Sequence, residues 1–421
     1  MNNAEGNRLT AGCTGIKRTT GQHPGGLIVV PQGRSIYEFT PVQHPADDPD
    51  SDIITTHFDF HSIHDNLLKL DELGHDVPTL IRHLWDISGI NPQNVPLDDP
   101  DTMRLFTDIS PLGIETDDIL GQPGTAAIPE FGTKFVRGML MDTQPTTFDG
   151  LVRISGLSHG TDVWLNNAAD YIKQGKATLK DVICVRDDIT THLIEMGMAP
   201  KQSFTISEAV RKGKGLKPEW EEEMRAHNLP DWYIESCNKI QYMFPRAHAA
   251  AYTMMSYRIA WFKVHQPLAF YCTYFSSKLD AFDAMTTAKG DAEIVRKYRE
   301  LKAMPKRTAV EEDHMTVLEV CHEFCKRGFQ FAPLDIYRSD VKKFRIEGNT
   351  LIPPFCALPG LGEAAAQSIV DERDKGPFMS MEDMILRCDR VSRSIGEALA
   401  AAGALGDIPL SNQLNLFDDL M

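Results

Sequence analysis

The sequence predicts an α+β protein that is mostly helical, and three observations predict this class. Short apolar runs bounded by turn residues occur near the start of the chain and predict strands. From about residue 80 to 280 the apolar spacing is mainly helical, with Pro and Gly marking the loops. Residues 355–405 are helical again, and we find no internal repeat or low-complexity segment.

Three strands are expected in the first 80 residues. Residues 27–30 follow a Gly-rich turn and predict a short buried strand. Residues 52–59 predict a second strand, and residues 67–71 predict a third that ends in the carboxylate of Asp71. A helix is then expected to start at Pro78, because proline suits the first helical turn.

Helices dominate the remainder of the chain. A long helix rich in Ala, Tyr, Met and Trp is predicted over residues 247–264, and Pro267 lies just beyond its end. Charged helices are predicted around residues 294–302 and 315–327. Strand-like pieces follow at residues 342–352.

The composition is that of a globular protein with several domains. The chain has 421 residues, 42% hydrophobic and 24% charged, a length that fits two to four domains. No stretch approaches the ~20 apolar residues of a membrane helix, and the start lacks a signal-peptide pattern. We therefore expect a cytoplasmic protein without membrane contact. Its eight scattered cysteines lack metal-ligand spacing and are expected to be reduced.

The net charge of −16 argues against a nucleic-acid-binding protein, because most such proteins are basic overall. Carboxylates on outer faces would still allow basic side chains to line one groove. Nucleic acid would therefore have to bind at local clusters of basic residues.

The run Leu-Pro-Gly-Leu-Gly at residues 358–362 predicts a helix-hairpin-helix. Gly360 and Gly362 let the backbone approach a phosphate closely, and the next helix offers unpaired N–H groups at its start. Such a contact positions duplex DNA without reading its sequence. A turn used only for packing is the alternative, and Glu363 is an unfavourable neighbour for a phosphate.

Cations gather near glycines and at a predicted helix start. Lys212 and Lys214 lie among flexible glycines, which suits a polyphosphate. Arg246 and His248 stand at the start of the long helix, where a cation and an imidazole can hold a nucleotide. A solvated loop and a capping histidine are the alternative interpretations.

Three other segments carry polar side chains. Residues 156–162 predict a polar loop that holds His159 between glycines, and Arg186 precedes two acidic residues. Either segment is open to a purely structural interpretation. Lys17 and Arg18 precede a loop with a histidine and glycines, which is a pattern typical of phosphate binding.

Asp71 is the most informative single carboxylate. It ends an apolar strand, close to Lys69 and just before Gly74. A carboxylate in this position can hold Mg²⁺, which prefers oxygen ligands and nucleotide phosphates. The alternative is an aspartate that caps the next turn.

The last eleven residues have the pattern of a peptide that binds a sliding clamp. A glutamine can form a hydrogen bond at the mouth of a pocket, and three apolar side chains can anchor the peptide. The residues are Gln413, Leu414, Leu416 and Phe417. A frayed terminus is the alternative.

Several runs in this order resemble the PolC-type replicative DNA polymerase III of Gram-positive bacteria. The first runs are Arg-Thr-Thr-Gly-Gln-His-Pro-Gly-Gly at residues 18–26 and the segment 56–71. Residues 154–164 and 244–252 follow, and the hairpin and the tail complete the family's order. The resemblance covers essentially the whole chain.

The resemblance implies a domain organisation. Residues 1–80 resemble the second half of the palm, and residues 81–285 resemble helical fingers. Residues 286–405 resemble a duplex-binding domain, whose helix-hairpin-helix lies at 355–375. Residues 406–421 resemble a flexible clamp-binding tail.

The resemblance also implies template-directed transfer of a deoxynucleotide to a primer 3′ end, with Mg²⁺ as cofactor. Asp71 falls where the family has its third catalytic carboxylate, and His159 and His248 are candidates to orient the incoming nucleotide. The candidates for triphosphate charge are Arg186, Lys212, Lys214 and Arg246. The implied partners are primer-template DNA, deoxynucleoside triphosphates, the sliding clamp (beta subunit) and the remaining replisome subunits.

One departure from the family affects the expected activity. The family's other two catalytic carboxylates form an Asp-x-Asp motif upstream of the matching segment, and no such motif precedes Arg18. We therefore expect the C-terminal third of a polymerase, with little activity alone. A non-catalytic module that binds duplex DNA and the clamp is the alternative. An unrelated metabolic enzyme is disfavoured, because no Rossmann, P-loop or triad signature is present.

Overall fold

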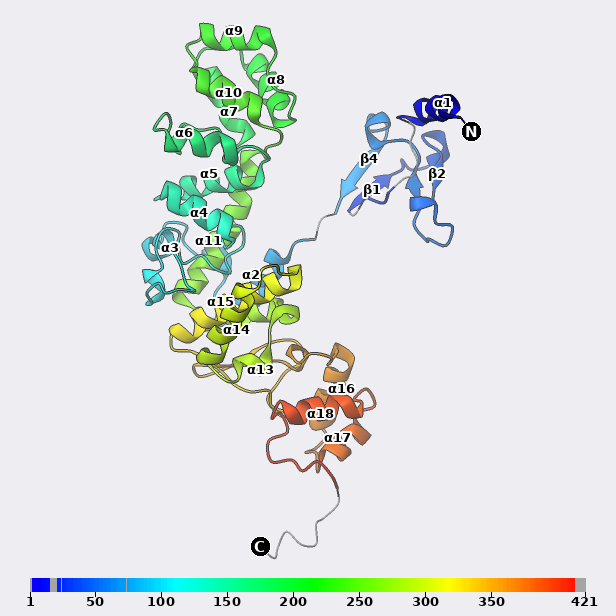
Figure 1. Ribbon diagram of the computed structural model, residues 1–421, viewed down its shortest axis with the longest axis vertical. Helices are drawn as coiled ribbons and strands as arrows, with labels where there is room; N and C mark the ends of the chain where they lie inside the picture. Colours follow the sequence, from blue (N-terminus) through cyan, green and yellow to red (C-terminus); the bar gives the residue numbers. More distant parts are fainter. Residues whose placement is uncertain (1, 16–20, 24, 73, 413–421) are drawn as a thin grey trace, which may run out of the picture. The chain divides into compact units, whose positions relative to one another are not determined.

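The computed structural model describes residues 2–15, 21–23, 25–72 and 74–412. It divides into two compact units, Met1–Asp76 and Val77–Met421, of which the first is the smaller. The mostly helical α+β class predicted from the sequence is confirmed, because small sheets accompany many helices (Figure 1).

The first unit is built from short elements. They are α1 (Asn3–Cys13), β1 (Gly26–Val29), β2 (Val42–Gln43), β3 (Thr55–Thr56) and β4 (Leu68–Asp71). The strand β1 pairs antiparallel with β4, and β2 pairs antiparallel with β3. The strand expected over residues 52–59 is therefore limited to two residues, and the strand expected at 67–71 is confirmed as β4.

One face of the β1–β4 pair carries only apolar side chains. Leu27 lies opposite Leu70, and Val29 lies opposite Leu68. All four are exposed, with Leu27 57% and Leu68 62% accessible. The prediction of a buried strand at residues 27–30 is therefore wrong on burial, because no described element of this unit covers that face.

The second unit begins with a helical region. Its elements are α2 (Asp76–Ser88), α3 (Pro100–Leu105), α4 (Lys134–Thr143), α5 (Phe148–His159), α6 (Ala169–Lys173), α7 (Arg186–Glu195), α8 (Pro200–Arg211), α9 (Pro218–Ala226), α10 (Asp231–Lys239) and α11 (Arg246–His265). The helix start near Pro78 and the long helix before Pro267 are confirmed.

The long helix α11 organises this region. It packs against α3 and α5 and against α12 (Pro267–Ser277), while α7 packs on α8. Tyr257 and Phe262 of α11 are fully buried. Lys263 is also fully buried, and its Nζ donates to the carbonyl oxygens of Gly124 (2.9 Å) and Ala126 (2.7 Å). A charged side chain in this core therefore holds the loop before α4.

The prediction of a polar loop over residues 156–162 is wrong for its first half. The helix α5 continues to His159, so Gly156 and Ser158 are helical. A Cβ built on Gly156 would lie 2.5 Å from Val185 Cγ1 and 2.7 Å from the Cys184 carbonyl oxygen. Glycine is required here for close packing of α5 against the segment before α7, and not for a turn.

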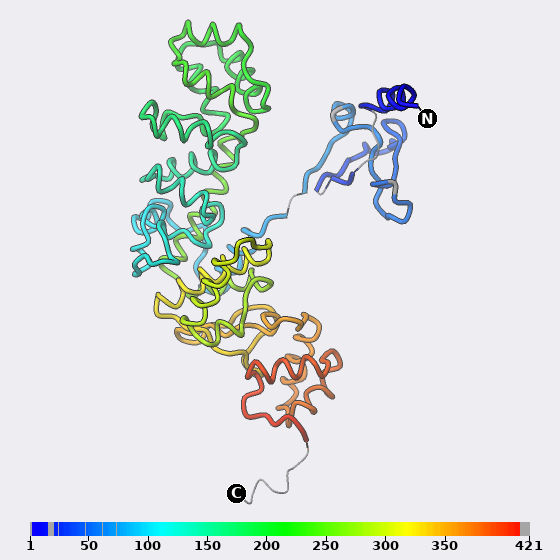
Figure 2. The backbone as a smooth tube through the Cα atoms, in the orientation of Figure 1, coloured from blue at the N-terminus to red at the C-terminus, as the bar shows by residue number. Residues whose placement is uncertain are grey.

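The carboxyl-terminal part alternates helices with a small sheet. It contains α13 (Ala284–Thr287), α14 (Asp291–Ala303), α15 (Ala309–Lys326), β5 (Gln330–Phe331), β6 (Arg345–Glu347), β7 (Thr350–Ile352), α16 (Glu363–Arg373), α17 (Met381–Arg387) and α18 (Arg393–Ala401). The strands follow the order β5-β7-β6. Figure 2 shows the backbone of α16 to α18 as the orange to red part of the tube.

No helix within the described residues is both long and apolar enough to cross a membrane.

Candidate functional site

Asp71 stands at the end of β4, opposite Gly26 in the register of β1. Its Oδ1 lies 3.2 Å from Lys69 Nζ. A Cβ built on Gly26 would stand 3.3 Å from Asp71 Oδ1 and only 2.8 Å from Nδ1 of His23. The glycine therefore allows a carboxylate and an imidazole to approach the same strand end.

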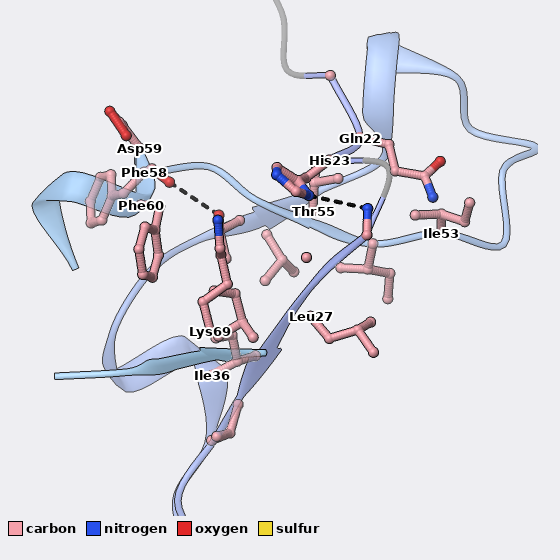
Figure 3. Close-up of a pocket in the computed structure, with 18 of the residues that line it drawn as sticks. Gln22, His23, Leu27, Ile36, Ile53, Thr55, Phe58, Asp59, Phe60 and Lys69 are labelled. Atoms are coloured by element: carbon pink, nitrogen blue, oxygen red, sulfur yellow. Dashed lines mark hydrogen bonds between the residues drawn. The ribbon is translucent and has the colours of Figure 1, made fainter. Parts of the chain in front are cut away.

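A hollow of about 720 Å³ lies beside this strand pair (Figure 3). His23, Phe60 and Lys69 are among the residues that line it. His23 Nδ1 accepts a hydrogen bond from the backbone N–H of Gly25 at 3.2 Å, which orients the imidazole. Lys69 Nζ lies 5.0 Å from the centroid of the Phe60 ring. Lys69 thus links the hollow to the carboxylate of Asp71.

Asp71 offers one carboxylate to a metal ion. Across the described ranges, no three His, Cys, Asp or Glu side chains come together as a metal-binding cluster. Mg²⁺ commonly takes one or two protein carboxylates and completes its shell with water and substrate phosphates. Asp71 fits that role as a single ligand, and the remaining ligands would come from elsewhere.

His159 ends α5 with both ring nitrogens facing acceptors. Its Nδ1 donates to the carbonyl oxygen of Ser155 at 2.7 Å, and its Nε2 contacts the carboxylate of Glu130. The hydrogen bond to Glu130 raises the pKa of His159 and outweighs burial, which lowers it. Glu130 has a left-handed φ of 67°, so the loop that carries it has an unusual backbone. The arrangement favours a positively charged imidazolium.

A ladder of aromatic rings, Tyr242, Phe244, His248 and Tyr252, surrounds the start of α11. The rings of Phe244 and His248 stack with centroids 4.7 Å apart at 19°, and the centroids of His248 and Tyr252 are 4.5 Å apart. Tyr242 meets Phe244 edge-on at 5.1 Å. His159 lies 6.2 Å from His248, so both predicted histidines belong to one site.

Arg246 is held by three carboxylates from other segments. Its backbone N–H donates to Asp187 Oδ2 at 2.7 Å. Its guanidinium pairs with Asp188 at 3.3 Å and with Asp149. The predicted cation is therefore present at the helix start, and the protein itself neutralises it.

Glu208 gathers three cations on α8 and at the start of α7. Arg211 donates to it through Nε and Nη2, both at 3.0 Å, and Arg186 donates through Nη1 at 3.2 Å. Lys212 Nζ lies 3.5 Å away. The hydrogen bonds from Arg211 contribute most to lowering the pKa of Glu208 to about 2. The carboxylate therefore stays ionised and holds these cations together.

Lys214 follows a tight turn. Gly213 has a φ of +69°, and a Cβ there would lie 2.5 Å from the carbonyl oxygen of Gln241. No ion pair joins Lys214 to another residue in the part of the chain that the structure describes. In sequence, Lys214 follows directly after the cations that Glu208 gathers. No carboxylate of the described residues pairs with its charge.

The predicted hairpin places two glycines in open space. Gly360 has a φ of +85°, Gly362 precedes α16, and a Cβ on either would meet no atom within 4 Å. Leu361 between them is buried. Glu363 at the first position of α16 pairs with Lys342, which compensates its negative charge. The first arm of the hairpin is a single 3₁₀ turn, Phe355–Ala357.

Some predicted residues lie outside the described part of the chain. They are Lys17, Arg18, Gln413, Leu414, Leu416 and Phe417.

Several residues around the start of α11 and on α8 were not predicted from the sequence. Glu130, Asp149 and Glu208 were not predicted, because their partners lie far away in the sequence. Phe204 was also missed, although it lies four residues before Glu208 on the same helix. The four-residue spacing of Phe204 and Glu208, which places both on one face of a helix, was the one signal that could have revealed them.

Three family models match successive parts of the chain. Residues 2–74 match the bacterial DNA polymerase III alpha NTPase domain, and residues 77–228 match the bacterial DNA polymerase III alpha subunit finger domain. Residues 328–414 match a helix-hairpin-helix motif. The last match includes the hairpin glycines.

Relatives are similar over nearly the whole chain. DNA polymerase III PolC-type of Bacillus cereus is 56% identical over 99% of this chain and 29% of its own length. The proteins of the same name from Thermotoga maritima and Bacillus subtilis are 52% and 54% identical over 99% of this chain, and 30% and 29% of their own lengths. The chain thus spans less than a third of each relative. Within that span, the chain belongs to the PolC-type DNA polymerase III family.

Proposed function

We propose that this chain works as part of a replicative DNA polymerase that adds deoxynucleotides to a primer 3′ end. The observation that supports this most is the convergence of distant segments at the start of α11. Arg186 N–H donates to the Phe244 carbonyl oxygen at 3.1 Å, and Met243 N–H donates to that of Arg211 at 3.3 Å. Cations, an imidazolium and stacked rings are the groups that bind a triphosphate and a base.

In this proposal the cations bind the triphosphate of the incoming nucleotide. Arg186 and Lys212 exchange part of their contact with Glu208 for phosphate oxygens, which also accept bidentate hydrogen bonds from guanidinium. Lys214 and Arg246 add charge. His159, held as an imidazolium by Glu130, attracts a phosphate through its positive charge, since both of its N–H groups already face Ser155 and Glu130. His248 presents its ring to the base.

Asp71 is proposed as the catalytic carboxylate that holds Mg²⁺. The bound ion would neutralise the charge that develops at the transferred phosphate. Lys69 keeps the carboxylate oriented through its ion pair at the strand end. From the family resemblance we expect two further carboxylates outside the matched segment, so this chain would supply one of three.

We assign residues 1–80 to the second half of a palm, 81–285 to fingers and 286–405 to duplex binding. The exposed apolar face of β1 and β4 favours a longer polymerase, because burying four aliphatic side chains would stabilise the complex by several kcal/mol. Further parts of such a polymerase would cover Leu27, Val29, Leu68 and Leu70.

The hairpin and the tail are proposed to hold the DNA and the clamp. Gly360 and Gly362 leave backbone N–H groups open to a phosphate of duplex DNA. Gln413, Leu414, Leu416 and Phe417 have the pattern that inserts into a sliding clamp.

The test is primer extension with Mg²⁺ and all four deoxynucleoside triphosphates. The chain is assayed alone and with a second polypeptide that supplies the remaining part of a PolC-type relative. We expect extension only in the mixture, and a loss of more than about 100-fold in the Asp71→Asn variant. Asp65→Asn is the matched control, because Asp65 is an exposed aspartate of the same unit.

Equal extension by wild type and Asp71→Asn would overturn the catalytic assignment. Duplex and clamp binding without extension in any mixture would favour the non-catalytic binding module instead.

A further inference from the structure

We propose that the fingers carry a stacking surface for single-stranded DNA on α8, beside the aromatic ladder at the start of α11, with which it shares Tyr242. We call it the α8 surface and define it by Phe204, Tyr242, Arg186, Arg211 and Lys212. This inference rests on the proposed function, because a polymerase must hold the unpaired template strand. It adds two rings, Phe204 and Tyr242, to which neither the motifs nor the family models assign a role.

The first ring of the α8 surface is Phe204, which is 51% exposed. A single exposed phenylalanine is ordinary on a protein surface. Here the guanidinium carbon of Arg186 lies 6.0 Å from the ring centroid, so the ring is held by a cation. Phe204, Glu208 and Arg211 are spaced four and three residues apart, which places them on one face of α8.

The second ring is Tyr242, which is 41% exposed. Its carbonyl oxygen accepts a hydrogen bond from Thr161 N–H at 2.8 Å, and its ring meets Phe244 at 5.1 Å. The neighbouring Met243 N–H donates to the Arg211 carbonyl oxygen at 3.3 Å. The backbone thereby ties Tyr242 to the end of α8, beside the cations that Glu208 gathers.

Two exposed rings near three cations match the chemistry of single-stranded DNA. Every base has an aromatic face that can stack on a ring, and each phosphate can contact a cation. In duplex DNA the faces of the bases are already stacked on one another, so the rings would gain nothing from a blunt duplex. Glu208 and Asp187 compensate part of the charge, and thus stacking should contribute more than phosphate contacts.

The test compares two labelled DNA molecules by fluorescence anisotropy. One is a blunt duplex, and the other is the same duplex with a single-stranded oligothymidine overhang. We expect the wild-type chain to bind the second more tightly. Phe204→Ala should reduce this gain about tenfold, a typical effect for one base stacked on one ring. Blunt-duplex affinity should not change, since Phe204 is not part of the hairpin.

Two further variants sharpen the test. Phe135→Ala removes a phenylalanine that is 45% exposed on α4, well separated from α8 (Figure 1), and should leave the gain unchanged. Phe204→Trp should keep the gain, because tryptophan also stacks. We also plot the logarithm of the gain in binding constant against the logarithm of the salt concentration. With three cations, the slope should be no steeper than about −2.

The outcomes separate this inference from the proposed function. Blunt-duplex binding without any gain from the overhang, or a gain that survives in Phe204→Ala, overturns the α8 surface alone. Failure to bind either DNA overturns the proposed duplex binding together with this inference.

Discussion

Gly26 lies directly opposite Asp71 in the β1–β4 pair, and a Cβ on Gly26 would stand 3.3 Å from Asp71 Oδ1. The same Cβ would stand 2.8 Å from Nδ1 of His23, closer than real contacts of this kind. The imidazole of His23 can therefore lie at the same strand end as Asp71 only because residue 26 has no side chain. The absence of a side chain at Gly26 therefore leaves room for both groups at one strand end.

We predict that Gly26→Ala slows primer extension in the complemented polymerase. The imidazole of His23 must move to admit the new methyl group. The same methyl group crowds the Asp71 carboxylate, whose Oδ1 would be 3.3 Å away. Misplacement of a catalytic group by a fraction of an ångström should cost on the order of tenfold in rate. Gly21→Ala is the control, because a Cβ there meets no atom within 4 Å. Equal rates for both variants would contradict the prediction.

His159 is predicted to give nucleotide binding a pH dependence. Its pKa is raised, chiefly by the hydrogen bond to Glu130, so the imidazolium persists to higher pH than it would without that bond. The KM for deoxynucleoside triphosphates should therefore rise as pH increases through that raised pKa. In Glu130→Gln the rise should begin at lower pH, because the main cause of the shift is gone. A KM profile that is identical in both proteins would refute this role.

Several features of the fold were predictable because they depend on local sequence. Proline and glycine mark the ends of helices directly, so the long helix before Pro267 and the helix start near Pro78 were identified. Gly156 misled the prediction because its role is tertiary. It allows α5 to approach Cys184 and Val185, and nothing in its neighbours distinguishes this from a turn.

The ion pairs of the candidate site could not be predicted. Arg246 meets Asp149, which is 97 residues away in sequence, and Arg186 meets Glu208, which is 22 residues away. A sequence read alone shows cations that look available to a phosphate. Only the fold shows that carboxylates already hold them, so phosphate binding must compete with these pairs.

His322 lies between two acidic residues of the second unit. The Nδ1 of His322 lies 2.6 Å from Asp291, and its Nε2 lies 2.8 Å from Asp117. Burial lowers the pKa of His322, but the hydrogen bonds to Asp291 and Asp117 outweigh it and the net pKa is raised. Burial likewise opposes the backbone and His322 hydrogen bonds that lower the pKa of Asp117 to about 2.

We predict that this cluster stabilises the fold most at mildly acidic pH. The contribution of His322 is complete below about pH 6.5 and is lost as pH rises through its raised pKa. The contribution of Asp117 is lost only as pH falls towards 2. His322→Asn should therefore cost about 3 kcal/mol near pH 6 and less at pH 9. The measurement is Tm against pH, and a constant difference from wild type would contradict it.

The hairpin allows a test in which DNA binding changes but the fold does not. Gly362 has an ordinary backbone conformation, since its φ is −77°, and a Cβ there points into open space. Gly362→Val is therefore expected to fold normally. Its side chain would occupy the space that a phosphate needs to reach the first N–H groups of α16, so duplex affinity should fall about tenfold.

Two other glycine variants show whether a loss of duplex affinity in Gly362→Val is specific to that position. Gly360→Ala changes a residue with a φ of +85°, so it should strain the backbone by about 1–2 kcal/mol and lower Tm as well as affinity. Gly138→Ala, on α4, also meets no atom within 4 Å. It should leave duplex affinity unchanged and raise Tm slightly, because alanine favours a helix interior more than glycine does. If Gly362→Val binds blunt duplex as tightly as wild type, the turn serves packing alone. The duplex would then have to be held elsewhere. Lys342 offers no alternative phosphate contact at this helix start, because it already pairs with Glu363.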